Sequence, residues 1–347
     1  MSCNEVAMIR KTELNKIMNA LMIRHWGIFL MDKADKNAPR YFDVENSIFD
    51  DVSLEKATVI AIALPYKLEL EENRPNFHFG KIEAFAWDFD YHIEVMQRLE
   101  ALSRMLNLMP ETEVRYYVDD SPFNDREVAF HAGLGRIGMN HLLINDALGS
   151  QFFIGYLVIK GHLDMDKTCI VQRHELKAEL QHPYCKSCNK CVYACPTSVC
   201  GNGKSNMLEC LSSLTQTKEV IEERFRAMMG DTIYGCSICQ KVCPLNKKDI
   251  INFVYEPKQS NWIDLFELLR MDRKTFKARY GHMGFAWRSQ WVYKRNALIV
   301  LGNSGKRAVL DELTRLQEIQ EASNLNEYYR WAINKLEISI LEESDII

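Results

Sequence analysis

Apolar runs in the first half of the chain predict buried strands flanked by helices. Residues 57–64 (ATVIAIAL) are rich in β-branched side chains and end at a proline, which is typical of a buried strand. Residues 114–118 and 152–159 have the same character. Residues 90–109 carry apolar side chains at helical spacing and stop at Pro110, so they predict a helix. Together these segments favour a mixed α/β domain.

The second half of the chain has helical stripes in place of strands. A short helix is expected at residues 208–214. Beyond about residue 260 the pattern predicts helices at 293–301, 308–316 and 328–340. Short antiparallel helices of this kind are typical of a helical-repeat unit.

Composition describes an ordinary globular protein of 347 residues, with 47% hydrophobic and 26% charged residues. This length allows two or three domains. No apolar run reaches the length of a membrane span. The first residues are charged, with Arg10 and Lys11 among them, so they lack the apolar core of a signal peptide. We therefore expect a cytoplasmic protein with no membrane partner.

The net charge of −4 conceals a basic segment near the C-terminus. Between residues 270 and 307, ten lysines and arginines stand against one acid, Asp272. Residues 308–347 hold nine acids against three basic residues. We call residues 270–307 the basic island. Such a segment is typical of nucleic-acid contact and, about equally, of a solvated helical face.

Cysteine spacing is the sharpest chemical signal in the chain. Residues 185–196 contain C-x2-C-x2-C-x3-C-P, and residues 236–244 contain C-x2-C-x3-C-P. The first run is the bacterial ferredoxin pattern for [4Fe–4S] clusters, in which the fourth cysteine serves the other cluster. Zinc is the alternative, because CxxC pairs also bind it. Eleven cysteines in a reducing compartment argue for metal or redox work, not disulfides.

Two [4Fe–4S] clusters need eight thiolates, and the two runs supply seven. Cys210 lies between the runs and completes the set, while Cys200 follows Cys195 too closely to be preferred. The expected ligands are Cys185, Cys188, Cys191 and Cys243 for one cluster, and Cys195, Cys210, Cys236 and Cys239 for the other. Two adjacent clusters would accept single electrons from a flavodoxin or ferredoxin and deliver them inward.

Further motifs resemble the epoxyqueuosine reductases. They are CLSSLTQTK at 210–218, MGDTIYGCSICQKVCPLN at 229–246, VDDSP at 118–122, AGLGRIGMN at 132–140, DYH at 90–92, YGHMGFAWR at 280–288 and KRNALIVLG at 294–302. The similarity keeps the same order over nearly the whole chain.

This resemblance implies an α+β fold in three domains. Residues 1–165 would be a mixed α/β, cobalamin-binding catalytic domain similar to that of reductive dehalogenases. Residues 166–255 would be a ferredoxin-like domain with two [4Fe–4S] clusters. Residues 256–347 would be a helical, HEAT-like region that binds tRNA.

The resemblance also implies an activity. The family reduces epoxyqueuosine at the wobble position of tRNA with a GUN anticodon to queuosine, the last step of queuosine biosynthesis. It uses cobalamin, as cob(II)alamin, and the two clusters, and we expect a monomer. Two alternatives stay open: a corrinoid iron–sulfur reductase of a small molecule, similar to a dehalogenase, and an electron-transfer protein that is not an enzyme.

Site residues follow from the same resemblance. Asp119 matches the proton-donating aspartate of the family, and its neighbour Asp120 is the rival. The expected cobalamin contacts are Asp119, His141, Ile154, Ser212, Gln216 and Lys218. The glycines of the 133–138 segment would permit close backbone approach to a large flat ligand.

The basic island provides candidate tRNA contacts. Trp287 and Phe285 are candidates for stacking on an unpaired base, although core packing is the simpler expectation for each. The candidate phosphate contacts are Arg273, Lys274, Lys277, Arg279, Arg288, Lys294 and Arg295.

Overall fold

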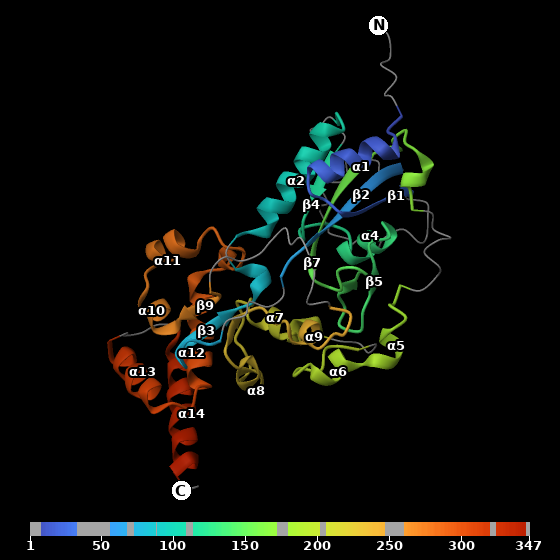
Figure 1. Cartoon of the computed structure of the whole chain (residues 1–347). Helices are drawn as coiled ribbons and strands as arrows, with labels where there is room; N and C mark the ends of the chain where they lie inside the picture. The colour runs from blue at the N-terminus through green and yellow to red at the C-terminus, as the bar shows by residue number, and fades with distance from the viewer. Residues whose placement is uncertain are drawn as a thin grey trace. The chain divides into compact units, whose positions relative to one another are not determined.

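The computed structural model describes residues 8–32, 56–67, 73–87, 89–108, 114–171, 180–201, 206–246, 260–319 and 324–344. The chain packs into two compact units, each built from three separate stretches (Figure 1). The first unit takes residues 1–66, 91–190 and 243–256, and the second takes 67–90, 191–242 and 257–347. This division follows packing, whereas the three domains expected from the sequence follow function and stay a prediction.

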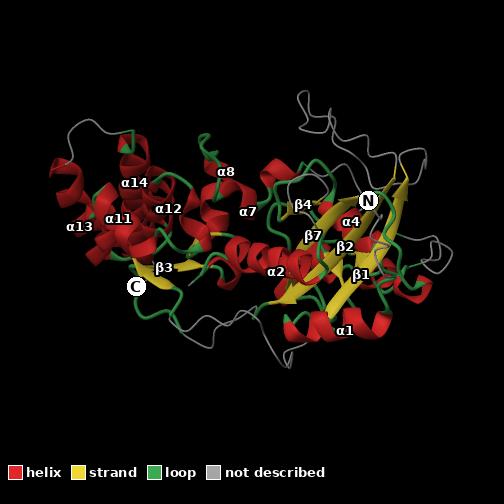
Figure 2. Cartoon of the chain, turned by 90° about the horizontal axis from the view of Figure 1, so that it is seen from above, coloured by secondary structure: helices red, strands yellow, loops and turns green. Residues whose placement is uncertain are grey.

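A four-stranded antiparallel sheet forms the centre of the first unit (Figure 2). Across the sheet the strands are β1 (His25–Asp32), β2 (Lys56–Pro65), β7 (Phe152–Lys160) and β4 (Val114–Tyr117). β2 and β7 are buried over almost their whole length, as expected for continuous apolar strands covered on both faces. The three strands expected from the sequence are confirmed, and β1 is an addition.

Helices cover both faces of this sheet. α2 (Tyr91–Met105) packs against β7, where Gly155 makes room for it, since a Cβ there would lie 2.3 Å from Val95 Cγ1. α4 (Asp125–His131) packs on the opposite face, in a core with Val59 and Phe130. α1 (Lys11–Ala20) lies beside α2, and a small hairpin, β5 (Arg136–Ile137) and β6 (Leu143–Ile144), follows α4.

The second unit combines a three-stranded sheet with a group of helices. Its strands are β8 (Thr232–Tyr234), β3 (Phe79–Ile82) and β9 (Trp262–Asp264), with β3 in the middle. Its longer helices are α10 (Leu265–Arg270), α11 (Arg273–Tyr280), α12 (Gln290–Gly302), α13 (Arg307–Ile319) and α14 (Asn326–Ser344).

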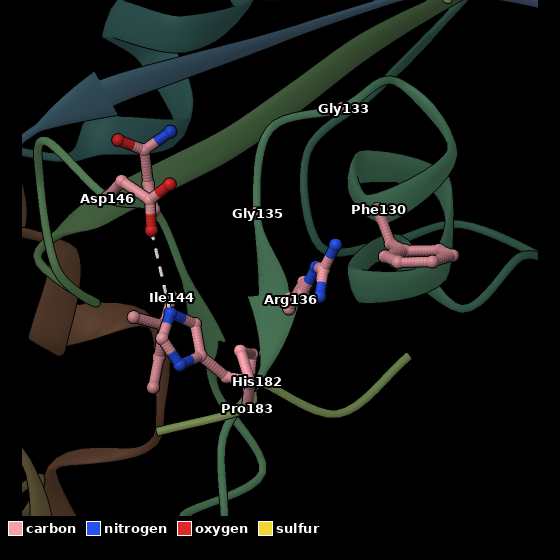
Figure 3. A pocket seen from close by; sticks show the side chains of 9 residues that line it. Phe130, Gly133, Gly135, Arg136, Ile144, Asp146, His182 and Pro183 are labelled. Carbon is pink, nitrogen blue, oxygen red and sulfur yellow. Dashed lines mark ion pairs between the residues drawn. The ribbon is translucent and has the colours of Figure 1, made fainter. Parts of the chain in front are cut away.

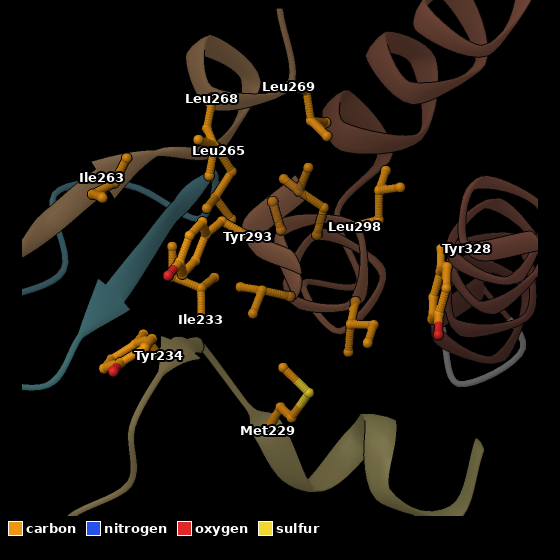
Figure 4. Close-up of a cluster of buried hydrophobic side chains, with 14 of the residues drawn as sticks. Met229, Ile233, Tyr234, Ile263, Leu265, Leu268, Leu269, Tyr293, Leu298 and Tyr328 are labelled. Atoms are coloured by element: carbon orange, nitrogen blue, oxygen red, sulfur yellow. The ribbon is translucent and has the colours of Figure 1, made fainter. Parts of the chain in front are cut away.

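α12 is buried on nearly every side and forms the centre of the second core. Figure 4 shows Tyr293 and Leu298 of α12 among apolar side chains from α10, β8 and α14. The helices expected at 293–301, 308–316 and 328–340 are confirmed. Their description as a HEAT-like repeat stays a prediction.

Short helices carry the cysteine segments. They are α5 (Cys185–Cys188), α6 (Lys190–Ala194), α7 (Leu211–Leu214), α8 (Glu223–Arg226) and α9 (Ile238–Lys241). The single helix expected at 208–214 is divided, because Cys210 has an extended backbone between a 3-10 turn (Met207–Glu209) and α7. In the part of the chain that the structure describes, no helix combines the length and apolar character needed to cross a membrane.

Candidate functional site

Asp119 lies two residues after the end of β4 and has a left-handed backbone, with φ of +62°. For a residue other than glycine this conformation costs roughly 1–3 kcal/mol, and such strain is concentrated at functional sites. The carboxylate accepts a hydrogen bond from the Tyr91 hydroxyl and lies 3.3 Å from His92 Nε2. Its side chain is still 56% exposed. The structure therefore presents an accessible carboxyl between two groups that can donate protons.

Elements of the first unit fix this arrangement. Tyr91 begins α2, and its ring stacks on Phe153 of β7 with centroids 4.0 Å apart. The β4–β7 register pairs Tyr117 with Tyr156 and ends there, two residues before Asp119. Ile154, an expected cobalamin contact, lies in β7 opposite Ala63 of β2, and its role beside a corrin stays a prediction.

A buried polar network anchors the turn that follows Asp119. Tyr156 donates from its hydroxyl to Asp125 Oδ1 at 2.6 Å and is also hydrogen-bonded to Ser121. Burial raises the pKa of Asp125 and also that of Tyr156. Ser121 Oγ in turn accepts from the Phe123 amide at 2.9 Å. Sequence reasoning missed these partners, because only the fold brings β7 and α4 to the same turn.

His141 also has a left-handed backbone, with φ of +61°. Its carbonyl oxygen accepts a hydrogen bond from Arg126 Nη1 at 2.6 Å. This contact ties the loop between β5 and β6 to α4. The role of His141 beside a corrin stays a prediction.

The glycine segment lines a cavity of about 450 Å³ in the first unit (Figure 3). Gly133 and Gly135 have φ of +73° and +157° and form one wall. His182 is 8% exposed, and its Nε2 lies 3.5 Å from Asp146 Oδ1. Arg136 contributes a positive charge to the same cavity. A Cβ at Gly135 would lie 2.3 Å from the Ile144 carbonyl oxygen, so packing of the chain itself already requires this glycine. Close approach of these glycines to a large flat ligand stays a prediction, and Asp119 and Ile154 do not line this cavity.

Three cysteines of the first expected set lie in the first unit. The charges of Cys185 and Cys188 act on the Cys243 thiol, so the three sulfurs are neighbours. Burial raises the pKa of Cys243, and the backbone amides of Leu245 and Asn246 oppose that shift. Asn246 Oδ1 also accepts from the Ser150 amide at 2.7 Å, which fixes this cysteine segment on the turn before β7. Cys191, the fourth expected ligand, belongs to the second unit.

The second expected set lies wholly in the second unit. Burial raises the pKa of Cys236 to about 11, and the charges of Cys210 and Cys195 add to that rise. Cys200 is hydrogen-bonded to Cys239, which together with burial raises the pKa of Cys200, and it also contacts Cys195. Cys210 and Cys195 thus act on Cys236, while Cys200 interacts with Cys239 and Cys195. Among the described residues, no three such side chains are already close enough together to hold a metal ion, so the ligand set stays a prediction.

Hydrogen bonds connect the segment after Cys210 to the basic island. Gln216 Nε2 donates to the Ser212 carbonyl at 2.9 Å, and its Oε1 accepts from the Tyr234 hydroxyl at 3.1 Å. The same hydroxyl accepts from Trp287 Nε1 at 2.9 Å. Two expected cobalamin contacts, Ser212 and Gln216, are therefore joined to an expected RNA contact. Lys218, the third contact in this segment, follows Gln216 closely and is exposed.

A basic and aromatic pocket of about 620 Å³ lies within the island. Trp287 is 57% exposed, and the Arg288 guanidinium lies 3.7 Å from the centroid of its indole ring. The basic side chains that line the pocket are Arg273, Lys277, Arg288 and Lys294. Four of the seven expected phosphate contacts thus line the same pocket as the exposed tryptophan.

Other members of the island have structural roles. Arg295 is fully buried and donates to backbone carbonyls, so the expectation that it contacts phosphate is wrong. Phe285 is fully buried in the core, so it is not a stacking surface for RNA. Arg279 forms an ion pair with Glu267, and Lys294 also donates to the Leu269 carbonyl at 2.8 Å. Helical spacing alone did not separate these roles.

Two protein-family models match separate parts of the chain. A model described as a 4Fe-4S double cluster binding domain matches residues 184–246. A model described as Epoxyqueuosine reductase QueG, DUF1730 matches residues 50–120. The first match confirms the iron–sulfur interpretation of the cysteine runs and replaces the zinc alternative.

Known relatives match over most of the chain. The epoxyqueuosine reductase of Staphylococcus aureus is 32% identical over 287 residues, which cover 80% of this chain and 72% of the relative. A crystal structure of a selenomethionine-labelled epoxyqueuosine reductase superposes with a TM-score of 0.76 at 26% identity, over 94% of this chain and 90% of that one. An epoxyqueuosine reductase solved with an epoxyqueuosine-modified tRNA-Tyr stem loop has a TM-score of 0.74 at 25% identity, with the same coverage of both chains. At this identity and coverage, the chain belongs to the epoxyqueuosine reductase family of oxidoreductases.

Proposed function

We propose that the protein reduces epoxyqueuosine at the wobble position of tRNA with a GUN anticodon to queuosine. The relative solved with an epoxyqueuosine-modified stem loop supports this substrate. Within this chain, the proposal is carried by Asp119, an accessible carboxyl in a strained backbone, held by Tyr91 and His92. Opening an epoxide and releasing its oxygen as water requires a proton donor at that oxygen, and the accessible carboxyl of Asp119 supports it in that role.

Tyr91 and His92 have different roles in the proton transfer from Asp119. The Tyr91 hydroxyl fixes the rotamer of the carboxyl, because Tyr91 is itself held against Phe153. His92 Nε2, 3.3 Å from Asp119 Oδ2, can return a proton after the carboxyl has given one. The whole conversion consumes two electrons and two protons.

The thiols support a pair of [4Fe–4S] clusters. We assign Cys185, Cys188, Cys191 and Cys243 to one cluster, and Cys195, Cys210, Cys236 and Cys239 to the other. The effect of Cys185 and Cys188 on Cys243, and that of Cys210 and Cys195 on Cys236, support these two sets. A flavodoxin or ferredoxin would supply the electrons one at a time.

The expected cobalamin contacts divide between the units. Asp119, His141 and Ile154 belong to the first unit, and Ser212, Gln216 and Lys218 to the second. Inside the second unit, Gln216 is fixed by hydrogen bonds to Ser212 and Tyr234, which supports it as a corrin contact. When bound, a corrin cobalt supplies strongly reducing chemistry that amino-acid side chains lack.

The basic pocket supports RNA as the substrate carrier. Phosphate contacts from Arg273, Lys277 and Arg288 would give affinity that falls with salt. Trp287 presents an exposed indole on which an unpaired base can stack. A small-molecule reductase needs neither feature, and this favours the tRNA reading over the dehalogenase-like alternative.

The test is analysis of tRNA nucleosides from a host strain that makes queuosine and from which the gene is deleted. We expect epoxyqueuosine to accumulate and the intact gene to restore queuosine. Asp119→Asn should not restore it. Asp120→Asn should restore it, because this neighbouring carboxyl has the same charge without the contacts of Asp119. Normal queuosine in a deletion strain with no second enzyme for the step would refute the substrate, and restoration by Asp119→Asn would refute the acid.

A further inference from the structure

A carboxyl group is buried against the loop that carries the second cysteine set. Glu83, directly after β3, is 3% exposed. Ser237, which lies between Cys236 and Cys239, donates from Oγ to Glu83 Oε2 at 2.6 Å. An acid from a distant part of the sequence is therefore hydrogen-bonded to the cysteine loop itself.

Backbone structure holds the two segments together. β3 and β8 pair in parallel, and the Glu83 amide donates to the Tyr234 carbonyl at 3.0 Å. Gly235, with φ of +81°, precedes Cys236, and a Cβ there would lie 2.9 Å from Glu83 Cβ. Only glycine allows the loop to come this close to the glutamate side chain.

Lys81 forms an ion pair with Glu83 at longer range. Lys81 Nζ lies 3.8 Å from Glu83 Oε1, beyond hydrogen-bond distance, and Lys81 is 18% exposed. Burial lowers the pKa of Lys81, and the charge of Glu83 opposes that shift. Oε2, the other oxygen, is turned to Ser237 and the cysteine loop. The shorter of the two side-chain contacts of Glu83 is thus the one that points to the cysteine loop.

We propose that Glu83 sets the reduction potential of the second cluster by placing a buried negative charge beside its cysteine loop. Reduction adds an electron to the cluster, so a fixed carboxylate nearby destabilises the reduced form more than the oxidised form. Glu83 is a positioning residue that acts through the loop and does not touch the cluster iron. This inference rests on the proposed ligand set Cys195, Cys210, Cys236 and Cys239.

The perturbation is Glu83→Gln in the anaerobically purified holoprotein, because glutamine keeps an oxygen that accepts from Ser237. In a redox titration followed by electron paramagnetic resonance, one of the two one-electron steps should move to higher potential. The expected change is about tenfold in the ratio of reduced to oxidised cluster at a fixed potential, or ~59 mV for one electron. The step that moves should be the one lost in Cys210→Ala.

Two variants separate charge from structure. Lys81→Met removes the partial counter-charge and should move the same step to lower potential. Glu318→Gln removes an exposed acid on α13 and should move neither step.

Three results would overturn the proposal. In the first, Glu83→Gln with full iron content leaves both steps in place. In the second, both steps move equally, which indicates a general loss of packing. In the third, Ser237→Ala, which keeps the charge, reproduces the whole shift. If Glu83→Gln does not hold iron, Lys81→Met provides the test instead. A shift of the same step to lower potential supports the proposal, and no shift or a shift to higher potential refutes it. Because the titration contains no tRNA, its outcome is independent of the substrate proposal.

Discussion

Arg295 gives the sharpest test of how α12 supports the segment after Cys210. It is fully buried and donates to the carbonyls of Leu214, Thr217 and Glu219 at 3.2, 2.8 and 2.8 Å, and to Asn296 Oδ1 at 3.0 Å. Burial lowers the pKa of Arg295 to about 10, so it remains charged at neutral pH. One guanidinium therefore satisfies three backbone acceptors, of which the Leu214 carbonyl is buried and the Thr217 and Glu219 carbonyls are partly buried.

The perturbation is Arg295→Met, which keeps most of the side-chain length but removes every donor. Each buried carbonyl left without a partner costs roughly 1–3 kcal/mol. The Leu214 carbonyl carries this cost in full, whereas water can reach the partly buried Thr217 and Glu219 carbonyls, so the three together cost about 3 kcal/mol. Removing the buried cation offsets part of this loss in stability, because its burial itself costs several kcal/mol, roughly. We expect a net loss of about 2 kcal/mol in the free energy of unfolding of the second unit.

The assay is urea unfolding followed by tryptophan fluorescence, at matched iron content. Arg295→Lys should recover little, because a single ammonium cannot reproduce the planar fork of donors. Arg273→Met, an exposed arginine of α11, is the control and should change stability by less than about 0.5 kcal/mol. If Arg295→Met unfolds at the same urea concentration as the parent, or if Arg295→Lys behaves as the parent, the reasoning is wrong.

Four further predictions concern other parts of the molecule. Trp287→Ala should weaken binding of an anticodon stem loop by about 10- to 100-fold in a fluorescence-anisotropy titration, since base stacking is worth about 1–3 kcal/mol. Trp287→Phe should keep most of the affinity, because its ring can still stack on a base. Cys210→Ala should halve the iron content from about eight atoms per chain, whereas Cys200→Ala should leave it unchanged, and the reverse result would exchange their roles. Burial lowers the pKa of His131 below 6.5, so the unfolded state binds more protons, and the free energy of unfolding should fall as the pH drops below about 6.5. His131→Gln should reduce this pH dependence in urea unfolding measured at several pH values. An unchanged pH dependence would show that His131 is not its source. Gly27→Ala should cost about 2 kcal/mol in urea unfolding, because its Cβ would lie 1.7 Å from a backbone carbonyl oxygen, and a cost near zero would show that α4 can move aside.

Strands and helices with strong local patterns could be predicted from the sequence. β2 is a run rich in β-branched residues, and α12 carries apolar side chains at most of its positions, so each was expected close to its observed bounds. β1 was missed because Gly27 and a charged end interrupt its pattern, and that glycine is required by the approach of α4. β3 and β9 are four and three residues long, too short to show a period, and their conformation depends on pairing with each other.

The candidate site shows the same limit. Asp119 could be predicted from its motif, but its bonds to Tyr91 and His92 depend on how α2 meets the end of β4. Arg295 stands next to Lys294 in a basic segment and was expected at the surface. Its burial follows from unpaired carbonyls in a segment about eighty residues earlier, which no local pattern can report. Sequence patterns locate chemistry, whereas long-range hydrogen bonding decides which charges face solvent.

The interleaving of the two units constrains how the protein is made. The first unit needs residues up to 256, and the second needs residues from 67 to the end. No contiguous fragment contains one unit without chain that belongs to the other. On the ribosome, the early strands β1 and β2 must therefore wait for β7 and for the last cysteine segment before their unit is complete. Expressing either half by simple truncation should yield an incomplete core. A circularly permuted or split gene would have to retain all five points at which the chain passes from one unit to the other.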